Sequence, residues 1–148
     1  MAQKAATAFL NLGGYSGPGV YTYKFTVGLA DINAAATTGD TILLCNLPPR
    51  SIVTQVFQKH SVVPAAPSLT TTTSTINDAG NVYGASLNWA TAVGPTASVL
   101  TQLLGTAKTA DPSITTPLYM TFNWGGATAA TFTAGSCDVW VTFIVLPA

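Results

Sequence analysis

The stretch S-C-D-V-W-V-T-F-I-V-L, residues 136–146, decides the fold that this sequence predicts. Every second residue from Cys137 to Val145 is apolar, with Val139, Val141 and Phe143 between them. Because successive side chains of a strand point to opposite faces, this alternation of β-branched and aromatic residues predicts a strand. Burying each of the four larger side chains would contribute about 1.5–3 kcal/mol. We therefore expect residues 136–146 to form a central strand of the core.

The second face of this stretch carries Asp138, Trp140, Thr142 and Ile144. It is not cleanly polar, so we expect Trp140 and Ile144 to be covered as well. A chain of zero net charge with apolar positions on both faces of one strand favours association. We therefore expect a homo-oligomer.

Further alternating segments, bounded by Gly, Pro and Asn turns, predict more strands. They span residues 20–28, 41–47, 51–63, 68–76, 117–124 and 127–132. Residues 29–38 are expected to form a loop or a short helical turn. Residues 81–92 are ambiguous, and residues 95–104 fit either a short helix or a strand. Seven or eight strands result, which predicts an all-β sandwich or barrel.

The first 19 residues have a different character, so we divide the chain into an N-terminal arm, 1–19, and a single β-domain, 20–148. Four glycines and a proline lie within residues 13–19, which excludes a regular helix or a central strand there. The sequence leaves two alternatives open. The segment is either a disordered terminus or an extended arm that orders on a neighbouring molecule. Phe9, Leu10 and Tyr15 are the anchors we expect in the second case.

Charged residues make up only 7% of the chain, against about 25% in a typical soluble domain. Five basic and five acidic residues cancel, and no basic patch favours nucleic acid. No run approaches the ~20 apolar residues of a membrane helix, and no export signal is visible. We therefore expect no nucleic-acid or membrane partner, and cysteines that are free and buried. The sequence leaves their pairing open.

Motifs of catalysis and metal binding are not found in the sequence. His60 is the single histidine, and it stands on the predicted strand 51–63, on the same face as Ile52, Val56 and Gln58 and opposite Val53 and Phe57. One histidine and two distant cysteines do not make a zinc set, and no nucleophile elbow or phosphate-binding loop occurs. We expect no catalytic residue, no metal and no cofactor, and hence no enzyme.

Trp124 is the best candidate for an exposed aromatic contact. It directly precedes Gly125 and Gly126, a turn that we expect at the surface. An aromatic side chain there would suit a protein partner or a sugar ring.

Two segments together resemble a known family. One is T-I-L-L-C-N-L-P-P-R-S-I-V-T-Q-V-F, residues 41–57. The other combines T-P-L-Y-M-T-F-N-W, residues 116–124, with T-A-G-S-C-D-V-W-V-T-F-I-V-L-P, residues 133–147. The pattern, over residues 20–147, resembles capsid decoration (cement) proteins and related small structural proteins of tailed bacteriophages.

This resemblance implies a jelly-roll-like antiparallel β-sandwich without catalytic residues. It also implies a homo-oligomer on the capsid surface of a virion, assembled in the bacterial cytoplasm, with the major capsid protein as partner. The expected function is to stabilise the shell by bridging neighbouring capsid subunits. The alternative is a receptor- or carbohydrate-binding module of a phage tail or surface fibre, which would use exposed aromatic side chains.

Overall fold

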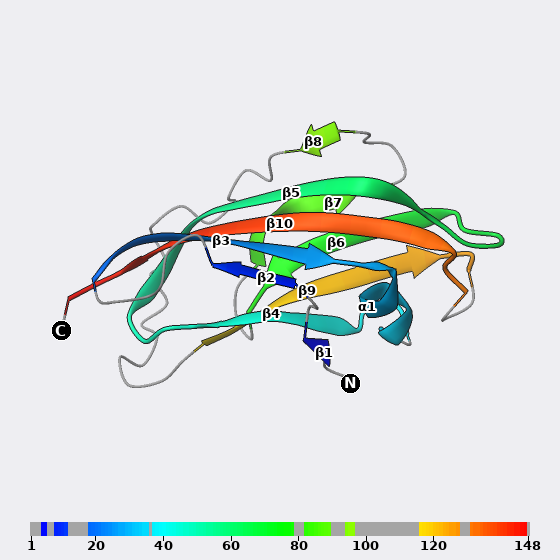
Figure 1. The fold of residues 1–148 in the computed structure, drawn as a ribbon. Helices are drawn as coiled ribbons and strands as arrows, with labels where there is room; N and C mark the ends of the chain where they lie inside the picture. Colours follow the sequence, from blue (N-terminus) through cyan, green and yellow to red (C-terminus); the bar gives the residue numbers. More distant parts are fainter. Residues whose placement is uncertain are drawn as a thin grey trace.

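The computed structural model describes residues 4–5, 8–11, 18–35, 37–78, 82–89, 94–96, 116–127 and 131–147. Two β-sheets face each other and enclose one core, and a short helix lies at one end of the sandwich (Figure 1). The C-terminal strand runs through the middle of one sheet, as residues 136–146 predicted.

Strand β10 centres the first sheet, here called the β10 sheet, whose order is β2-β3-β10-β5-β8. Its members are β2 (Ala8–Asn11), β3 (Gly19–Val27), β10 (Ala134–Val145), β5 (Ser51–Ala65) and β8 (Gly94–Thr96). The second sheet, called the β9 sheet, has the order β1-β4-β9-β6-β7. Its members are β1 (Lys4–Ala5), β4 (Thr41–Leu47), β9 (Thr116–Gly125), β6 (Thr71–Asn77) and β7 (Val82–Asn88).

The eight strands from β3 to β10 have jelly-roll topology. They form the four-stranded arrays β3-β10-β5-β8 and β4-β9-β6-β7, and within each array every neighbouring pair is antiparallel. Successive strands pass from one sheet to the other, except β6 and β7, which pair as a hairpin. This is the eight-stranded double-sheet arrangement of jelly rolls. The all-β sandwich is therefore confirmed; the added pairing of β1 with β4 is parallel.

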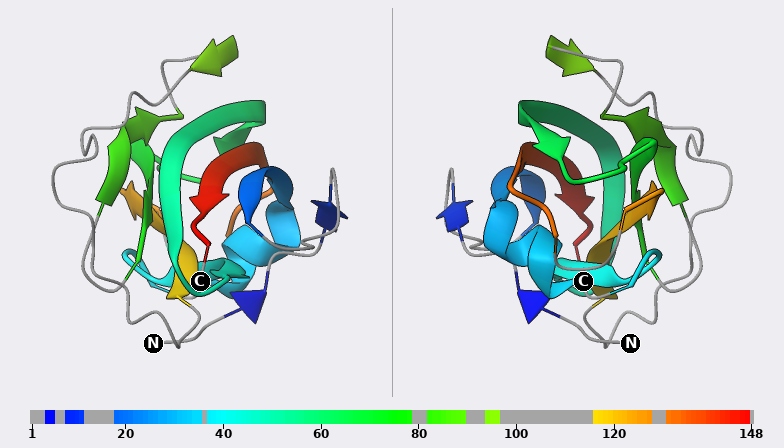
Figure 2. Two further views of the ribbon diagram at one scale, coloured as in Figure 1. Left: turned by 90° about the vertical axis from the view of Figure 1, so that its left-hand side faces the viewer. Right: turned by 90° about the vertical axis from the view of Figure 1, so that its right-hand side faces the viewer.

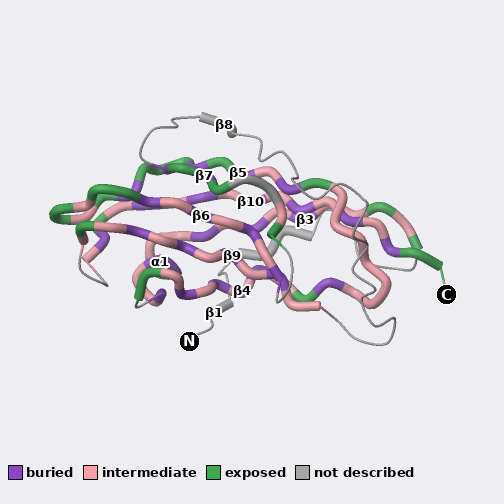
Figure 3. Tube along the Cα trace, turned by 180° about the vertical axis from the view of Figure 1, so that it is seen from behind, coloured by how far each residue is buried: buried purple, intermediate pink, exposed green. Residues whose placement is uncertain are grey.

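The inner face of β10 is fully buried, as its alternation indicates (Figure 3). Val139, Val141 and Phe143 are 0% exposed. They pack into a cluster that the opposite sheet completes with Leu118, Met120 and Phe122. On its two sides β10 is paired with β3 and with β5 along most of its length, so these two strands take their position from it.

A β-bulge in β5 changes which side chains of this strand face the core. Thr142 of β10 is opposite Gln55, whereas Phe143 is opposite Val53, so Thr54 is the extra residue. An extra residue moves the following side chains to the other face. The single alternation predicted for residues 51–63 is therefore wrong. Val53 lies with Val56, Gln58 and His60 on the inner side, while Ile52 and Phe57 pair with Ile144 and Trp140 of the outer face.

The helical turn expected within residues 29–38 is α1 (Leu29–Ala34), which buries Ile32 and begins where the Gly28 amide donates to the Asp31 carboxylate at 3.0 Å. The short strand expected at 127–132 is not confirmed, because residues 127 and 131–132 are outside any strand and 128–130 lie outside the described residues. Of residues 95–104, only 95 and 96 are described, and they belong to β8.

Replacing Val141 by Asp should prevent folding. The carboxylate would lie at a position that is 0% exposed, and the effective penalty for burying an ion is several kcal/mol, comparable with a net stability of about 5–15 kcal/mol. The matched control is Thr142→Asp, one residue along β10 on the half-exposed face. Circular dichroism and solubility should show an unfolded first variant and a folded second one. Equal behaviour of the two variants would contradict this assignment of faces.

Candidate functional site

The expected N-terminal arm contributes edge strands to both sheets. β1 pairs with β4 in the β9 sheet and β2 pairs with β3 in the β10 sheet (Figure 2). Of the expected anchors, Phe9 is in register with Phe25 and Leu10 with Lys24. Tyr15 lies outside the described residues. Residues 4–5 and 8–11 thus pair with the sheets of their own chain, and contact with a partner stays a prediction.

Trp124 is buried, so the expectation that it lies exposed beside its turn is wrong. Its side chain is 8% exposed and packs against Phe122 and Phe132, each with ring centroids 5.5 Å away. Alternation along β9 places it on the same inner face as Leu118 and Phe122. Only Gly126 of the adjoining turn is exposed. The period-2 pattern of residues 118–124 was the sequence signal for this burial.

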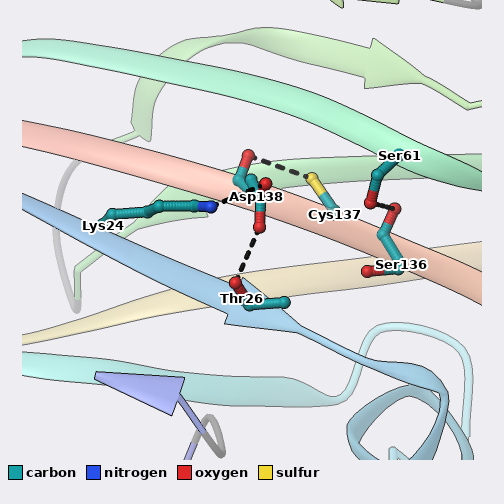
Figure 4. Close-up of polar contacts among 6 residues, drawn as sticks. All are labelled: Lys24, Thr26, Ser61, Ser136, Cys137 and Asp138. Carbon is teal, nitrogen blue, oxygen red and sulfur yellow. Dashed lines mark hydrogen bonds and ion pairs between the residues drawn. The ribbon is translucent and has the colours of Figure 1, made fainter. Parts of the chain in front are cut away.

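A polar and aromatic cluster occupies the outer face of the β10 sheet. The Asp138 carboxylate accepts a hydrogen bond from the Thr26 hydroxyl at 2.7 Å and lies 3.0 Å from the Lys24 ammonium (Figure 4). The ammonium lies 5.2 Å from the centroid of the Trp140 ring. The cation is therefore held by a carboxylate and an aromatic face at once.

Phe57 extends this cluster onto β5. Its ring packs edge-on against Trp140 with centroids 5.2 Å apart. Further along the same face, the hydroxyls of Thr22 and Thr142 are hydrogen-bonded at 2.9 Å. Sequence alternation correctly placed Phe57 on the face opposite Val56 and His60, but it carried no signal that pairs Phe57 with Trp140 of β10. Side chains of the same chain thus contact Trp140, which was expected to be covered.

His60 and Cys137 are opposite each other on neighbouring strands, both buried on the inner side. Burial lowers the pKa of His60 and raises that of Cys137 to about 12, with the Asp138 charge adding to the rise. Both groups are therefore neutral near pH 7, which is the opposite of an activated thiolate–imidazolium pair. Within the described residues, no group of three or more His, Cys, Asp or Glu side chains could hold a metal ion. No helix there has the length and apolarity to cross a membrane.

Removing Asp138 should destabilise the fold more than removing Lys24. Asp138→Ala loses a charge-assisted hydrogen bond worth about 1.5–3 kcal/mol and an ion pair worth about 0.2–1 kcal/mol. Lys24→Ala loses the ion pair and the aromatic contact alone. The coupling from a double-mutant cycle in urea should be about 0.2–1 kcal/mol and should fall in 1 M salt. Thr142→Ala is the control outside the ion pair, and its cycle with Lys24→Ala should give no coupling. Equal coupling in both cycles would contradict this arrangement.

Both thiols should react slowly in the folded protein. The structure has Cys45 and Cys137 as free thiols, Cys45 half-buried and Cys137 buried. Burial raises the pKa of each from 9.0 to about 12, which lowers the reactive thiolate fraction about 1000-fold. The variants Cys45→Ala and Cys137→Ala each leave one thiol for labelling at pH 8 with and without guanidinium. Denaturation should speed labelling at least ~100-fold, more for Cys137. Rapid labelling of a native variant would show its thiol to be exposed.

Comparison with known proteins gives a likeness of fold. No protein-family model matches the chain, and no curated protein sequence matches it. Among solved structures, the chain is similar to one in the capsid asymmetric unit of cyanophage Pam1, with 23% sequence identity and a TM-score of 0.55. The match covers 95% of this chain and 96% of that one. The two proteins therefore share their fold over nearly their whole length.

Proposed function

We propose that this chain is a structural protein of a bacteriophage virion that binds the capsid and stabilises it by bridging neighbouring capsid subunits. The observation that carries the proposal is the likeness over 95% of the chain to a protein in a cyanophage capsid asymmetric unit. It agrees with the resemblance of residues 41–57, 116–124 and 133–147 to phage decoration proteins. The role is non-catalytic, the protein belongs to the virion, and its assembly takes place in the bacterial cytoplasm.

The physical basis of such stabilisation is mass action. A protein that binds only the assembled shell stabilises it by RT ln(1 + [L]/Kd), which is about 2.7 kcal/mol per site at a hundredfold excess over Kd. A chain without net charge meets little long-range repulsion at a crowded shell. The same property favours the homo-oligomer, which would contact several copies of the major capsid protein at once and gain avidity.

The N-terminal arm, residues 1–19, is the segment we propose for contact between subunits. Its described parts pair as edge strands with both sheets of the sandwich at residues 20–148, through β4 and through β3. Edge pairing of this kind is open to exchange, because a strand from a neighbouring chain can supply the same main-chain hydrogen bonds. Phe9, Leu10 and Tyr15 would then give the added strand its side-chain specificity.

The alternative of a carbohydrate-binding module loses its first candidate residue, since Trp124 is buried in the core. Trp140 is the tryptophan with a half-exposed side chain, and Lys24 and Phe57 already pack against it. No second function is therefore proposed.

Capsid shells prepared without this protein test the proposal. Shells are mixed with the full chain, with a truncation that lacks residues 1–17, and with a Phe9→Ala, Leu10→Ala double variant. Bound protein is measured by sedimentation and shell integrity by heating. We expect the full chain to bind and to raise the disruption temperature of the shell, and both arm variants to bind more weakly while their circular dichroism stays that of β-structure.

Two negative outcomes of this experiment have different meanings. Failure of the full chain to bind shells or to protect them overturns the proposed function. Equal occupancy and protection by all three proteins leaves the function standing and shows that the shell contact lies on the sandwich and not on the arm. Asn11→Ala, at the end of β2, is the matched control for the double variant.

A further inference from the structure

A buried polar network crosses the core between the two sheets. The Ser74 hydroxyl donates to the Gln58 side-chain oxygen at 2.6 Å, and the Trp89 indole N–H donates to the Ser74 oxygen at 2.7 Å. All three side chains are 0% exposed. The network connects β5 of the β10 sheet with β6 of the β9 sheet and with Trp89, the residue that follows β7. A hydrogen bond in such a solvent-excluded site is strong, and its loss leaves buried polar groups unpaired.

His60 is the next inward position beyond Gln58, and its imidazole packs on the same Trp89. The two rings are nearly parallel, at 13°, with centroids 6.3 Å apart. The imidazole is 3% exposed, and neither Nδ1 nor Nε2 has a hydrogen-bond partner within the described residues. Thr72, the inward position before Ser74, is 1% exposed, and its hydroxyl likewise has no partner there.

The groups that face His60 do not compensate a positive charge. Cys137 of β10 and Gly94 of β8 are in register with His60. Burial keeps the Cys137 thiol neutral. Trp89, which directly follows β7, stacks on His60, and its indole N–H donates to the Ser74 oxygen of β6. The nearest charged residues in sequence, Lys59 and Asp138, stand at outward positions of their strands. An imidazolium therefore carries two N–H donors without described acceptors, and leaving these buried is costly.

We propose that His60 is an acid-sensitive element of the fold, whose protonation opens the contact of β5 with β6 and β7 at Trp89. The neutral imidazole is compatible with stacking on Trp89. The charged imidazolium becomes hydrated only when the contact between β5 and Trp89, here called the seam, opens. Separation of the seam also exposes the Gln58–Ser74–Trp89 network to water. This acid-sensitive element involves core residues alone, and it does not depend on the proposed capsid role.

The direction of the pH effect follows from the difference between the folded and unfolded chain. Burial lowers the pKa of His60 below 6.5, so the unfolded state binds the proton more tightly. Stability is complete above pH 6.5 and falls as the pH drops from 6.5 towards the lower pKa of the folded state. One proton taken up on unfolding raises the unfolding equilibrium constant by up to about tenfold per pH unit. His60 is the only histidine, so replacing it isolates the contribution of an imidazole to the pH dependence.

Urea unfolding of the full chain at pH 7.5, 6.5, 5.5 and 5.0 tests the proposal. The unfolding equilibrium constant of the wild type should rise by up to about tenfold for each pH unit below 6.5. His60→Phe keeps an aromatic ring against Trp89 without a titrating group, and His60→Gln keeps a polar side chain. Both variants should have a smaller pH slope than the wild type between pH 6.5 and 5.0. Lys59→Gln, one residue away on the outer side, should retain the slope of the wild type.

A measurement on the wild type keeps the test valid if both His60 variants fail to fold. The imidazole Cε1 proton in the NMR spectrum should titrate below pH 6.5, and amide exchange at Trp89, corrected for its intrinsic pH dependence, should accelerate as the pH falls from 6.5 to 5.0. Titration at or above pH 6.5, or exchange at Trp89 that does not change, would overturn the proposal. So would His60 variants with the same pH slope as the wild type.

Discussion

Burial of the inner face of β10 between the two sheets is the constraint on which the rest of the structure depends. Phe143 packs against Tyr21 and Tyr23 of β3, with ring centroids 5.7 and 5.2 Å apart. From the other sheet, rings of β9 and its neighbours complete the core, with Phe122 in contact with Trp89, Trp124 and Phe132. Because β10 is hydrogen-bonded to β3 on one side and β5 on the other, its position fixes three strands of one sheet and the face that they present to the second.

One extra residue in β5 then decides which side chains the molecule presents outside and which it keeps inside. The bulge at Thr54 directs Phe57 outward to Trp140 and leaves Gln58 and His60 in the core. The bulge brings Val53 to the same inner side as Gln58 and His60 and sets Ile52 opposite Ile144 on the outer face.

The edges of the sandwich are the natural places for assembly. A jelly roll keeps open strand edges that a closed barrel does not have, and proteins cover such edges with short strands, loops or partners. Here β1 and β2, which precede all the long strands, pair at β4 and β3. For the proposed capsid role, such edges would be useful because main-chain pairing with a neighbour needs neither charge nor a deep pocket. This suits a chain that has only 7% charged residues.

The sequence by itself determined the all-β class, the central position of residues 136–146 and the bounds of β4, because period-2 alternation and Gly or Pro turns are local properties of the chain. It also determined the inward face of β10. Only the tertiary structure decided side-chain contacts between different elements, such as those of Lys24 with Asp138 and of Trp89 with Ser74. The sequence around either residue of such a pair does not indicate which residue it will contact. The register shift at Thr54 likewise arises only in the pairing of β5 with β10. The contact of Lys24 with Asp138 and the pairing of β5 with β10 join residues far apart in the sequence, so local pattern could not predict them.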